Sequence, residues 1–280
     1  MNTQQQQAAR FQELHTRNAL FILPNAWDAG SAKIFEEAGY EAIATTSAGI
    51  AYSLGYADGE IITMEELLPV VRQIAKRTTV PLSVDIERGY GTTPEEVTEN
   101  VRAIIAAGAV GVNIEDGYPA AATHAESYLE ETNTQVAKIE QLAALKDELD
   151  IPFVINARTC AYLLSIGDND TRLDATIERC NAYVAAGADC IFIPGGLDKA
   201  TVTALTKAIA APLNILASPA FNDIQELQNI GVRRISLGSG PVRATYAALM
   251  DIASAVQNKH DLSALFSHPF SYQKANEFFG

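Results

Sequence analysis

Short apolar runs recur along the chain in two alternating settings, and both settings predict β-strands. Some runs follow a glycine that ends an alanine-rich helical pattern, as in "AAGAVGVNIED" (106–116), because the position after a helix favours a left-handed backbone. Others follow a proline, as in "TVPLSVDIE" (79–87), because proline fixes an extended entry and does not continue a helix. With the opening run, the series predicts eight strands, at 19–28, 37–47, 79–87, 106–116, 150–158, 185–195, 211–217 and 229–239.

Helical patterns fill the intervals between these runs, and several have recognisable starts. In "TTPEEVTENVRAIIAAG", Thr93 is the expected N-cap, Pro94 the first helical residue and Glu96 the partner in a capping box. Further helix starts are expected at Thr63 with Glu66, at Asp198 and at Asp223. Strands that alternate with helices imply parallel strands joined by right-handed crossovers.

This alternation predicts an α/β fold, and eight such units over about 240 residues match the closed (β/α)8 TIM barrel. An open doubly wound sheet is the alternative, but it usually has fewer strands, and no G-x-G-x-x-G follows the first run. We therefore expect a single barrel domain over residues 1–280, with an N-terminal helix or extension at 1–17 and a helical tail at 256–280. The apolar end of the tail, "HPFSYQKANEFFG", predicts packing on a neighbouring subunit of a homo-oligomer, either a dimer or a tetramer.

The balance of charge narrows the classes of partner. The 280 residues carry a formal charge of −14, with a sequence pI near 4.7, which argues against binding to nucleic-acid phosphates. No apolar run approaches the ~18 residues of a membrane span, and the glutamine-rich start does not resemble a signal peptide. The three cysteines form no C-x-x-C pair and are interpreted as reduced thiols. We therefore expect a cytoplasmic protein without nucleic-acid or membrane partners.

Charged residues gather where the predicted strands end. Asp85 and Glu87 end the third strand, Glu115 ends the fourth and Arg158 ends the fifth, and barrel enzymes carry their active sites at this end of the strands. Converging carboxylates raise one another's pKa unless a cation neutralises them. A hard divalent ion, Mg²⁺ or alternatively Mn²⁺, prefers such oxygen ligands, and zinc is disfavoured because softer ligands are absent from these strand ends.

We therefore predict a metal site in which Asp85 is a direct ligand and Glu87 and Glu115 bind directly or through water. Arg158 is the expected anchor for a substrate carboxylate, because its planar guanidinium can form two parallel hydrogen bonds. Two plainer interpretations stand beside this one. The charges could form a structural network of acids and arginine without chemistry, and Glu87 could pair with Arg88 or with a helix terminus.

Four more residues each have a functional and a structural interpretation. His124, after the fourth strand, is either a general acid–base group or an exposed loop histidine. Trp27, after the first strand, either walls a pocket or packs beneath a helix. Asn214, in the seventh strand, either points into the barrel mouth or is a buried amide bonded to neighbouring backbone. Cys160 is either a thiol nucleophile or a packed thiol, and the packed thiol is favoured because no histidine lies near it in sequence to act as a base.

Five stretches carry a resemblance to known proteins, namely "LPNAWDAGSAKIFEEAGYEAI", "TTSAGIAYSLGYAD", "VDIERGYG", "VNIEDG" and "NARTCA". Taken together and in order, they resemble the isocitrate lyase/phosphoenolpyruvate mutase superfamily from about residue 18 to about residue 255. The resemblance implies a (β/α)8 barrel that binds Mg²⁺ and a small 2-oxo or 2-hydroxy carboxylate. It also implies chemistry on the C–C or P–C bond beside that carboxylate.

The resemblance also assigns roles to residues. It implies Asp85 as the principal metal ligand, with Glu87 and Glu115 in a water-bridged shell. Residues 46–48 would place hydroxyl and backbone N–H groups on the carboxylate and oxo oxygens, and Asp58 would help to order the metal site. The candidate catalytic residues are Arg158, Asp58, Thr46 and His124, and the candidate substrate-binding residues are Thr46, Ser47, Ala48, Trp27, Arg158 and Asn214.

Departures from the family's motifs narrow the expected reaction. The loop "GYPAAATHAESYLEE" has neither the K-[KR]-C-G-H of isocitrate and methylisocitrate lyases nor the K-x-N-S-like gating sequence of the phosphonate branch. Breaking a bond next to a carbonyl leaves an enolate, which a chelated metal stabilises. We therefore expect C–C bond lyase or oxo-acid decarboxylase chemistry on a small 2-oxo or 2-hydroxy acid. The alternatives are P–C bond chemistry of the phosphonopyruvate/PEP mutase or hydrolase type, and an oxo-acid-binding protein with little turnover.

Overall fold

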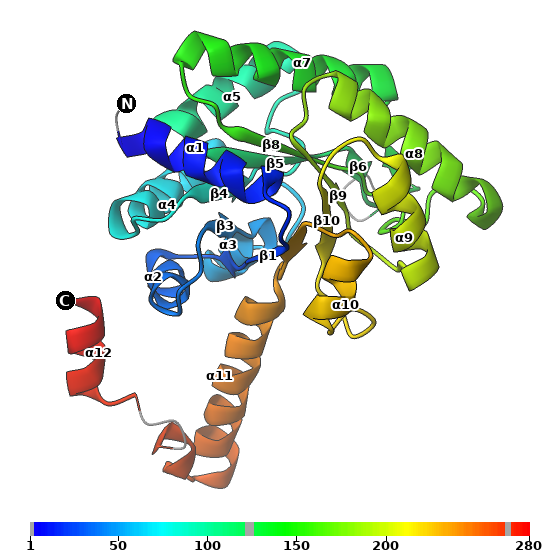
Figure 1. Cartoon of the computed structure of the whole chain (residues 1–280). Coiled ribbons are helices and arrows are strands. Elements are labelled where there is room, and N and C mark those ends of the chain that lie inside the picture. The colour runs from blue at the N-terminus through cyan, green and yellow to red at the C-terminus, as the bar shows by residue number, and fades with distance from the viewer. Residues whose placement is uncertain (1–2, 121–125, 267–269) are drawn as a thin grey trace. The chain divides into compact units, whose positions relative to one another are not determined.

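A computed structural model describes residues 3–120, 126–266 and 270–280 of the chain. The chain divides into two compact units, Met1–Gly238 and Ser239–Gly280. The first unit alternates strands with helices along nearly its whole length, whereas the described part of the second contains helices only. Figure 1 shows the strands of the first unit gathered inside and most of its helices around them.

Nine strand segments of the described residues form one sheet in which neighbouring strands are parallel. They are β1 (Phe21–Leu23), β2 (Asn25–Ala26), β3 (Ile43–Thr45), β4 (Leu82–Asp85), β5 (Gly111–Glu115), β8 (Val154–Arg158), β9 (Cys190–Ile193), β10 (Leu213–Leu216) and β11 (Arg234–Ser236). Their order is β1-β11-β10-β9-β8-β5-β4-β3-β2, and only Pro24 separates β1 from β2 along the chain. Both ends of the sheet are thus parts of the first predicted strand, so the sheet closes almost completely into the predicted (β/α)8 TIM barrel.

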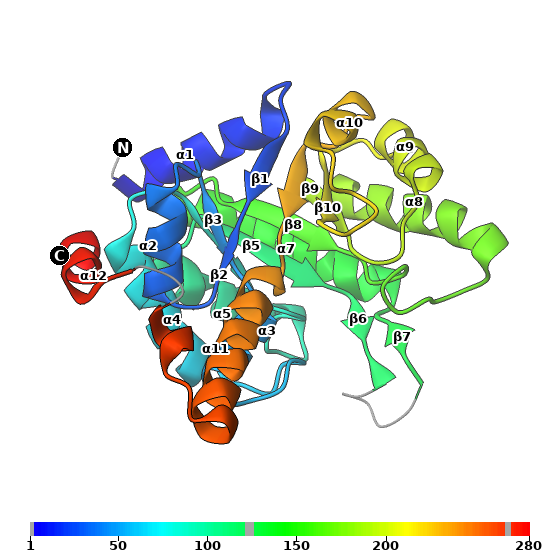
Figure 2. The same ribbon diagram turned by 90° about the horizontal axis from the view of Figure 1, so that it is seen from below.

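Helices surround these strands in the first unit (Figure 2). They are α1 (Thr3–Thr16), α2 (Ala29–Glu37), α3 (Ser47–Ser53), α4 (Met64–Arg77), α5 (Pro94–Ala106), α7 (Thr132–Leu149), α8 (Asn169–Ala185), α9 (Lys199–Ala208) and α10 (Ile224–Asn229). The two predicted capping boxes, which begin at Thr93 and Thr63, are both present. Asp198 and Asp223 also accept the backbone hydrogen bonds expected of N-caps.

Side chains alternate between the two faces of each strand, as the pleat requires. Val84, Val112 and Ile155 face outward and belong to the main hydrophobic cluster that the strands share with the helices. The intervening positions face the barrel interior, and along three strands they change from small or apolar to polar or acidic and then to charged. These inward series are Ser83, Asp85 and Glu87; Gly111, Asn113 and Glu115; and Val154, Asn156 and Arg158.

Helix α1 lies across the N-terminal ends of the strands. The Gln4 side chain donates to the carbonyl oxygens of Ile105, at the end of α5, and of Ala109, just before β5, at 2.7 and 2.9 Å. The Gln7 side chain donates to the carbonyl oxygen of Thr79, just before β4, at 2.7 Å. These bonds attach the helix to the starts of two neighbouring strands.

The apolar face of α1 fills this end of the barrel. Phe11 is completely buried and lies in a second hydrophobic cluster with Leu23 and Val154. A Cβ atom on Gly111 would lie 2.6 Å from Cε1 of Phe11, so the glycine leaves room for the ring. The N-terminal extension predicted from the sequence is therefore a plug for the barrel.

Strand β5 leads into a short antiparallel hairpin of β6 (Gly117–Tyr118) and β7 (Tyr128–Leu129). The rings of Tyr118 and Tyr128 stack across it, with centroids 4.6 Å apart. The candidate His124 belongs to the connection between these strands and lies outside the described residues.

The second unit consists of α11 (Gly240–Lys259), the 3₁₀ helix η1 (Ser263–Phe266) and α12 (Tyr272–Phe279). The ring of Phe270 contacts those of Phe278 and Phe279 edge to face, with centroids 6.0 and 6.4 Å apart. Large exposed apolar side chains of this unit are Leu249, Met250, Leu262, Leu265, Phe266, Phe270, Tyr272 and Phe279. Across the described parts of both units, no helix has the length and apolar character needed to cross a membrane.

Candidate active site

A cavity of about 280 Å³ lies where β4, β5 and β8 end. Its charged lining comes from four segments, because parallel strands bring their C-terminal ends to the same rim. These charged residues are Asp58, Glu87, Arg88, Glu115 and Arg158. The structure thus brings together four of the predicted charged site residues, and it adds Arg88 to them.

Asp85 ends β4, and both of its carboxylate oxygens accept hydrogen bonds. Oδ2 accepts from the backbone N–H of Ser47 at 3.2 Å, in the first turn of α3, and Oδ1 accepts from the Asn113 side chain at 2.8 Å. Asn113 in turn accepts a hydrogen bond from the Asn156 side chain at 2.8 Å. The carboxylate is therefore oriented by amides on two neighbouring strands, as is common for groups that ligate a metal.

Glu115 and Arg158 face each other across the β5–β8 register. Arg158 Nη1 lies 2.7 Å from Glu115 Oε2, and the two side chains are only 16% and 10% exposed. The guanidinium carbon also lies 5.6 Å from the centroid of the Phe192 ring. Burial raises the pKa of Glu115 to about 7, although the charge of Arg158 acts in the opposite direction. The Glu115 carboxylate and the Phe192 ring together fix the orientation of Arg158 in the cavity.

Glu87 follows β4 with a left-handed backbone, at φ 48°, which is uncommon for a residue with a side chain. Its side chain is buried and accepts a hydrogen bond from the Tyr90 hydroxyl at 3.3 Å. Burial, and after it the charge of Asp85, raises the pKa of Glu87 to about 9. Arg88 pairs with Glu60 rather than with Glu87, so the plainer interpretation of Glu87 as its ion-pair partner is wrong.

The segment 46–48 forms the start of α3 beside the cavity. Thr46 is the N-cap, and its hydroxyl oxygen accepts from the Gly49 N–H at 3.3 Å. Ser47 lines the cavity, and its side chain hydrogen-bonds to Asp58. Burial and then the charge of Asp85 raise the pKa of Asp58, against the effect of that hydrogen bond. Ala48 is buried in the same turn.

Two predicted substrate-binding residues lie elsewhere. Asn214 is completely buried on β10 and exchanges hydrogen bonds with the Ser236 hydroxyl at 3.0 and 3.2 Å. Trp27 is partly buried against the main hydrophobic cluster. Neither side chain lines the cavity, and their contact with a substrate stays a prediction. Cys160 does line it, but the thiol is buried and burial raises its pKa, which confirms the expected packed thiol.

Three residues that the sequence pattern did not assign to the site contribute to it. Asn113 and Asn156 orient Asp85, and their signal was a polar residue at an inward position two residues before Glu115 and Arg158. Arg88 lines the cavity, and its signal was its place directly after the second acid of the third strand.

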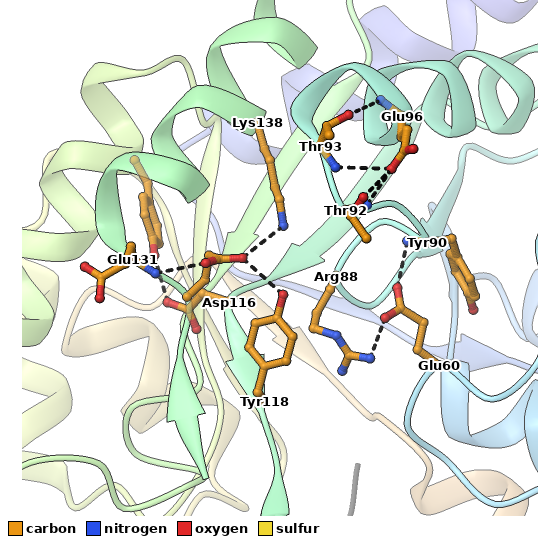
Figure 3. A network of polar contacts seen from close by, with 12 residues as sticks. Glu60, Arg88, Tyr90, Thr92, Thr93, Glu96, Asp116, Tyr118, Glu131 and Lys138 are labelled. Atoms are coloured by element: carbon orange, nitrogen blue, oxygen red, sulfur yellow. Dashed lines mark hydrogen bonds and ion pairs between the residues drawn. The ribbon is translucent and has the colours of Figure 1, made fainter. Parts of the chain in front are cut away.

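The loops around the cavity are tied together through Arg88 (Figure 3). Arg88 forms an ion pair with Glu60, from the connection after α3, and its guanidinium carbon lies 4.9 Å from the centroid of the Tyr118 ring. Glu60 also accepts from the backbone N–H of Tyr90 at 2.7 Å. The Tyr118 hydroxyl lies 3.1 Å from Glu130 and donates to it. One side chain therefore links the loops that follow β3, β4 and β5.

The donor set fits a hard divalent cation held largely through water. Every candidate ligand is a carboxylate. Burial is the main cause of the raised pKa values of Asp58, Glu87 and Glu115, and the charge of Asp85 adds to each, so a nearby cation would stabilise their ionised forms. Within residues 3–120, 126–266 and 270–280, no three His, Cys, Asp or Glu side chains are grouped so that they could hold an ion. A hydrated ion with Asp85 as its direct protein ligand suits this arrangement, since Mg²⁺ usually keeps several waters.

Known proteins are similar to this chain in both sequence and fold. The family model described as phosphoenolpyruvate phosphomutase matches residues 11–257. The chain is 34% identical over 252 residues to the uncharacterized protein Rv1998c of Mycobacterium tuberculosis, covering 90% of each. It is also 34% identical over 207 residues to an oxaloacetate decarboxylase of Rhodopseudomonas palustris, covering 73% of this chain and 69% of that protein.

A solved structure of oxaloacetate acetylhydrolase in complex with the product oxalate has a similar fold. The two share 25% sequence identity with a TM-score of 0.85. The match covers 98% of this chain and 94% of that one, so the likeness extends well beyond the strand ends that form the site.

Proposed function

Because the chain belongs to the phosphoenolpyruvate phosphomutase family, within the isocitrate lyase/phosphoenolpyruvate mutase superfamily, we propose that it is a Mg²⁺-dependent enzyme of small 2-oxo or 2-hydroxy acids. The reaction in this proposal is cleavage of a C–C bond near the oxo group, of the lyase or decarboxylase type. The observation that carries it is a single small cavity in which Arg158 lies beside the carboxyl groups of Asp58, Glu87 and Glu115. Such a site suits an anionic acid and a cation together.

In this proposal each side chain has a defined task. Asp85 would hold Mg²⁺ directly, and Glu87 and Glu115 would do so through water. When bound, Mg²⁺ supplies Lewis-acid stabilisation of negative charge on the oxo oxygen. Arg158 would hold the carboxylate beside the oxo group, because its orientation is already fixed by Glu115. The Ser47 N–H donates a hydrogen bond to Asp85, and the Ser47 hydroxyl bonds to Asp58. These two bonds hold the acidic side of the cavity in place.

For a 3-carboxy-2-oxo acid the reaction balances without a further cofactor. The bond between C3 and its carboxylate breaks, CO₂ leaves, and the electron pair stays on the substrate as an enolate. The enolate then takes up one proton at C3 and becomes a 2-oxo acid that is shorter by one carbon. The related oxaloacetate decarboxylase, named above, supports this choice of reaction.

P–C bond chemistry of the phosphonopyruvate type is the second candidate, and the matching phosphomutase family model favours it. An assay with Mg²⁺ and separate oxaloacetate, phosphonopyruvate and methylisocitrate distinguishes the candidates by their products. We expect pyruvate from oxaloacetate, loss of that activity with EDTA, and its return with Mg²⁺ or Mn²⁺. Phosphoenolpyruvate or phosphate formed from phosphonopyruvate, with no product from the other two acids, would favour the second candidate. Absence of every product, together with thermal stabilisation by oxo acids, would favour an oxo-acid-binding protein with little turnover.

We also propose that the chain forms a homo-oligomer, a dimer or a tetramer. The support is the set of large apolar side chains exposed in the second unit, such as Met250, Phe266 and Tyr272, because extensive exposed apolar surface is uncommon on soluble monomers. Light scattering after size-exclusion chromatography gives the mass directly. A single species at the 30.0 kDa of one chain would contradict the proposal.

A further inference from the structure

Asp116 directly follows β5 and is completely buried, and the proposed reaction assigns it no task. In the ladder between β5 and β8, the N–H of Val154 donates to the carbonyl oxygen of Val110 at 3.0 Å. Such bonds recur at every second residue of a parallel pair, so the N–H of Cys160 is the one expected to reach the carbonyl oxygen of Asp116. It donates instead to the Asp116 side chain, at 2.8 Å from Oδ1. The side chain thus takes the place of its own carbonyl in the ladder.

This exchange leaves the Asp116 carbonyl oxygen available for the hairpin. It accepts from the N–H of Glu130 at 2.7 Å, just after β7. Arg179 Nη1, on α8, donates to the Glu130 carbonyl oxygen at 2.9 Å and to Asp116 Oδ2 at 3.2 Å, and the Tyr183 hydroxyl donates to Oδ2 at 2.7 Å. Asp116 is therefore a branch point, at which the backbone holds the hairpin and the side chain holds the segment after β8.

The segment that the side chain holds begins at Arg158. The N–H that Asp116 accepts lies two residues after Arg158, and the intervening N–H of Thr159 donates to the carbonyl oxygen of Phe192 on β9 at 3.0 Å. The chain beyond Arg158 is thus attached on one side to β9 and on the other to β5. The 2.7 Å contact between Arg158 and Glu115 depends on the relative position of these two strand ends.

We propose that Asp116 is a positioning residue for Arg158, so that it controls binding of the substrate carboxylate without affecting the metal side of the cavity. This inference rests on the proposed function and concerns the organisation of the same site. Asp85 is oriented by other groups, the Ser47 N–H on α3 and the Asn113 side chain. The carboxylate-binding half and the metal-binding half of the cavity are therefore positioned by separate hydrogen bonds.

Asp116→Ala in the full-length protein tests this separation. It removes the acceptor and leaves space in which a water can bond to the freed donors. We expect the KM for oxaloacetate to rise about 10-fold, the lower end of the range for a hydrogen bond to a charged group, because Arg158 then meets the carboxylate in a poorer geometry. Mg²⁺ alone should raise the melting temperature of the variant as much as that of the original protein. Asp116→Asn keeps one acceptor oxygen for the Cys160 N–H and should recover most of the affinity.

Asp189 provides a matched control on the same strand. Its Oδ2 also accepts a backbone N–H of β8, from Ile155 at 2.6 Å, and it pairs with Lys146 at 2.6 Å, but at the N-terminal end of the strand. Asp189→Ala should lower the melting temperature and leave the KM unchanged. An unchanged KM in Asp116→Ala, an equal rise in both alanine variants, or loss of the Mg²⁺ response in Asp116→Ala would overturn the inference.

Hydrogen–deuterium exchange distinguishes failure of this inference from failure of the proposed function. In Asp116→Ala, residues 128–131 and 159–164 should exchange faster than in the original protein, whereas residues 82–87 should not. If the original protein neither binds nor converts oxaloacetate, the proposed function fails, and the exchange pattern decides whether Asp116 holds the segment after Arg158. Should Asp116→Ala not fold, Tyr183→Phe removes one donor to the same carboxylate. It should raise the KM about threefold, and an unchanged KM there would count against the inference.

Discussion

The two ends of the barrel are made by the same strands but have opposite chemistry. At the N-terminal end, α1 fills the interior, and Phe11 packs against a strand position that has no side chain, Gly111. Four residues further along the same strand, on the same inward face, Glu115 pairs with Arg158. Four residues of strand span only about 13 Å. A closed apolar end and a charged cavity are thus set by which residue type occupies successive inward positions.

One buried charge at the closed end sharpens this comparison. Arg234 on β11 is 2% exposed, and its Nη1 lies 3.4 Å from Nε2 of His15 on α1. Nδ1 of His15 lies 2.8 Å from the carbonyl oxygen of Phe11, so it donates there and Nε2 remains an acceptor. At the closed end, the charge of Arg234 therefore lies against the neutral ring of His15. The end with the cavity, which we call the open end, instead collects acidic side chains that a cation would neutralise.

The largest expected effect comes from neutralising Asp85 at the open end. In Asp85→Asn the shape is kept but the negative charge and the proposed metal ligand are lost. We expect oxo-acid turnover to fall by about 100- to 1000-fold, the range for losing a preorganised electrostatic group. Thermal stabilisation by Mg²⁺ should disappear as well. Initial rates measure the loss of turnover, and melting curves with and without Mg²⁺ measure the loss of stabilisation.

The matched control removes an acid from the opposite end. Asp189 precedes β9 and lies 2.6 Å from Lys146 Nζ, and it also accepts from the Ile155 N–H at 2.6 Å. Asp189→Asn should lower the melting temperature yet keep the response to Mg²⁺. If both variants lost that response alike, the assignment of metal binding to the open end would be wrong.

Removing the plug tests the closed end. Phe11→Ala deletes a completely buried ring, and such substitutions cost about 3–5 kcal/mol of the free energy of unfolding. Urea denaturation measures that loss. The KM for the oxo acid should stay unchanged under conditions where the variant is folded, because the ring packs on Gly111, four strand residues away from Glu115 in the charged cavity. A KM that rises in step with the lost stability would show that the two ends are coupled.

Local patterns explain why the fold could be predicted from the sequence. The capping boxes at Thr93 and Thr63 form within four residues of chain, so their hydrogen bonds follow from neighbouring residue types. Gly108 and Gly187 have φ of 110° and 105° after their helices, as a glycine that ends a helix predicts. Once the eight strands are located, the rule that strand–helix repeats form parallel sheets predicts their arrangement.

From periodicity alone, the site was predictable only where it depends on strand ends. Glu115 and Arg158 meet because all strands of a parallel barrel end at one rim. The amide relay from Asn156 through Asn113 depends on the register between β5 and β8, which residue types alone do not specify. The ion pair of Arg88 with Glu60 depends on the course of a long connection between α3 and α4. The periodicity of the sequence therefore could not predict contacts between irregular segments.

A smaller effect is expected from the pH dependence of the closed end. Burial, and after it the charge of Arg234, lowers the pKa of His15 from 6.5 to about 3. Between these values the unfolded chain binds a proton that the folded chain does not, so stability falls as the pH falls through this window. From pH 6.5 to pH 5 the loss amounts to roughly 2 kcal/mol.

His15→Gln removes this titration while keeping a polar side chain beside Arg234. The difference in unfolding free energy between the original protein and the variant should shrink as the pH falls from 6.5 to 5. Titratable groups elsewhere contribute equally to both proteins and cancel in that difference. Parallel pH profiles for the two proteins would mean that His15 has the same pKa in the folded and unfolded chains, and would contradict its role as a neutral acceptor.

The smallest expected effect concerns a helix cap at the open end. Thr93 begins α5 directly after the loop that carries Glu87, and Thr93→Ala should cost about 1 kcal/mol of stability, as losing an N-cap does. That loop has separate support, since the Asn100 side chain donates to the carbonyl oxygens of Gly89 and Tyr90 at 3.0 and 2.9 Å. We therefore expect an unchanged KM in Thr93→Ala, as in the equivalent cap variant Thr63→Ala. A KM raised in the first variant only would show that the α5 cap also positions Glu87, and that structural and chemical roles overlap at this end.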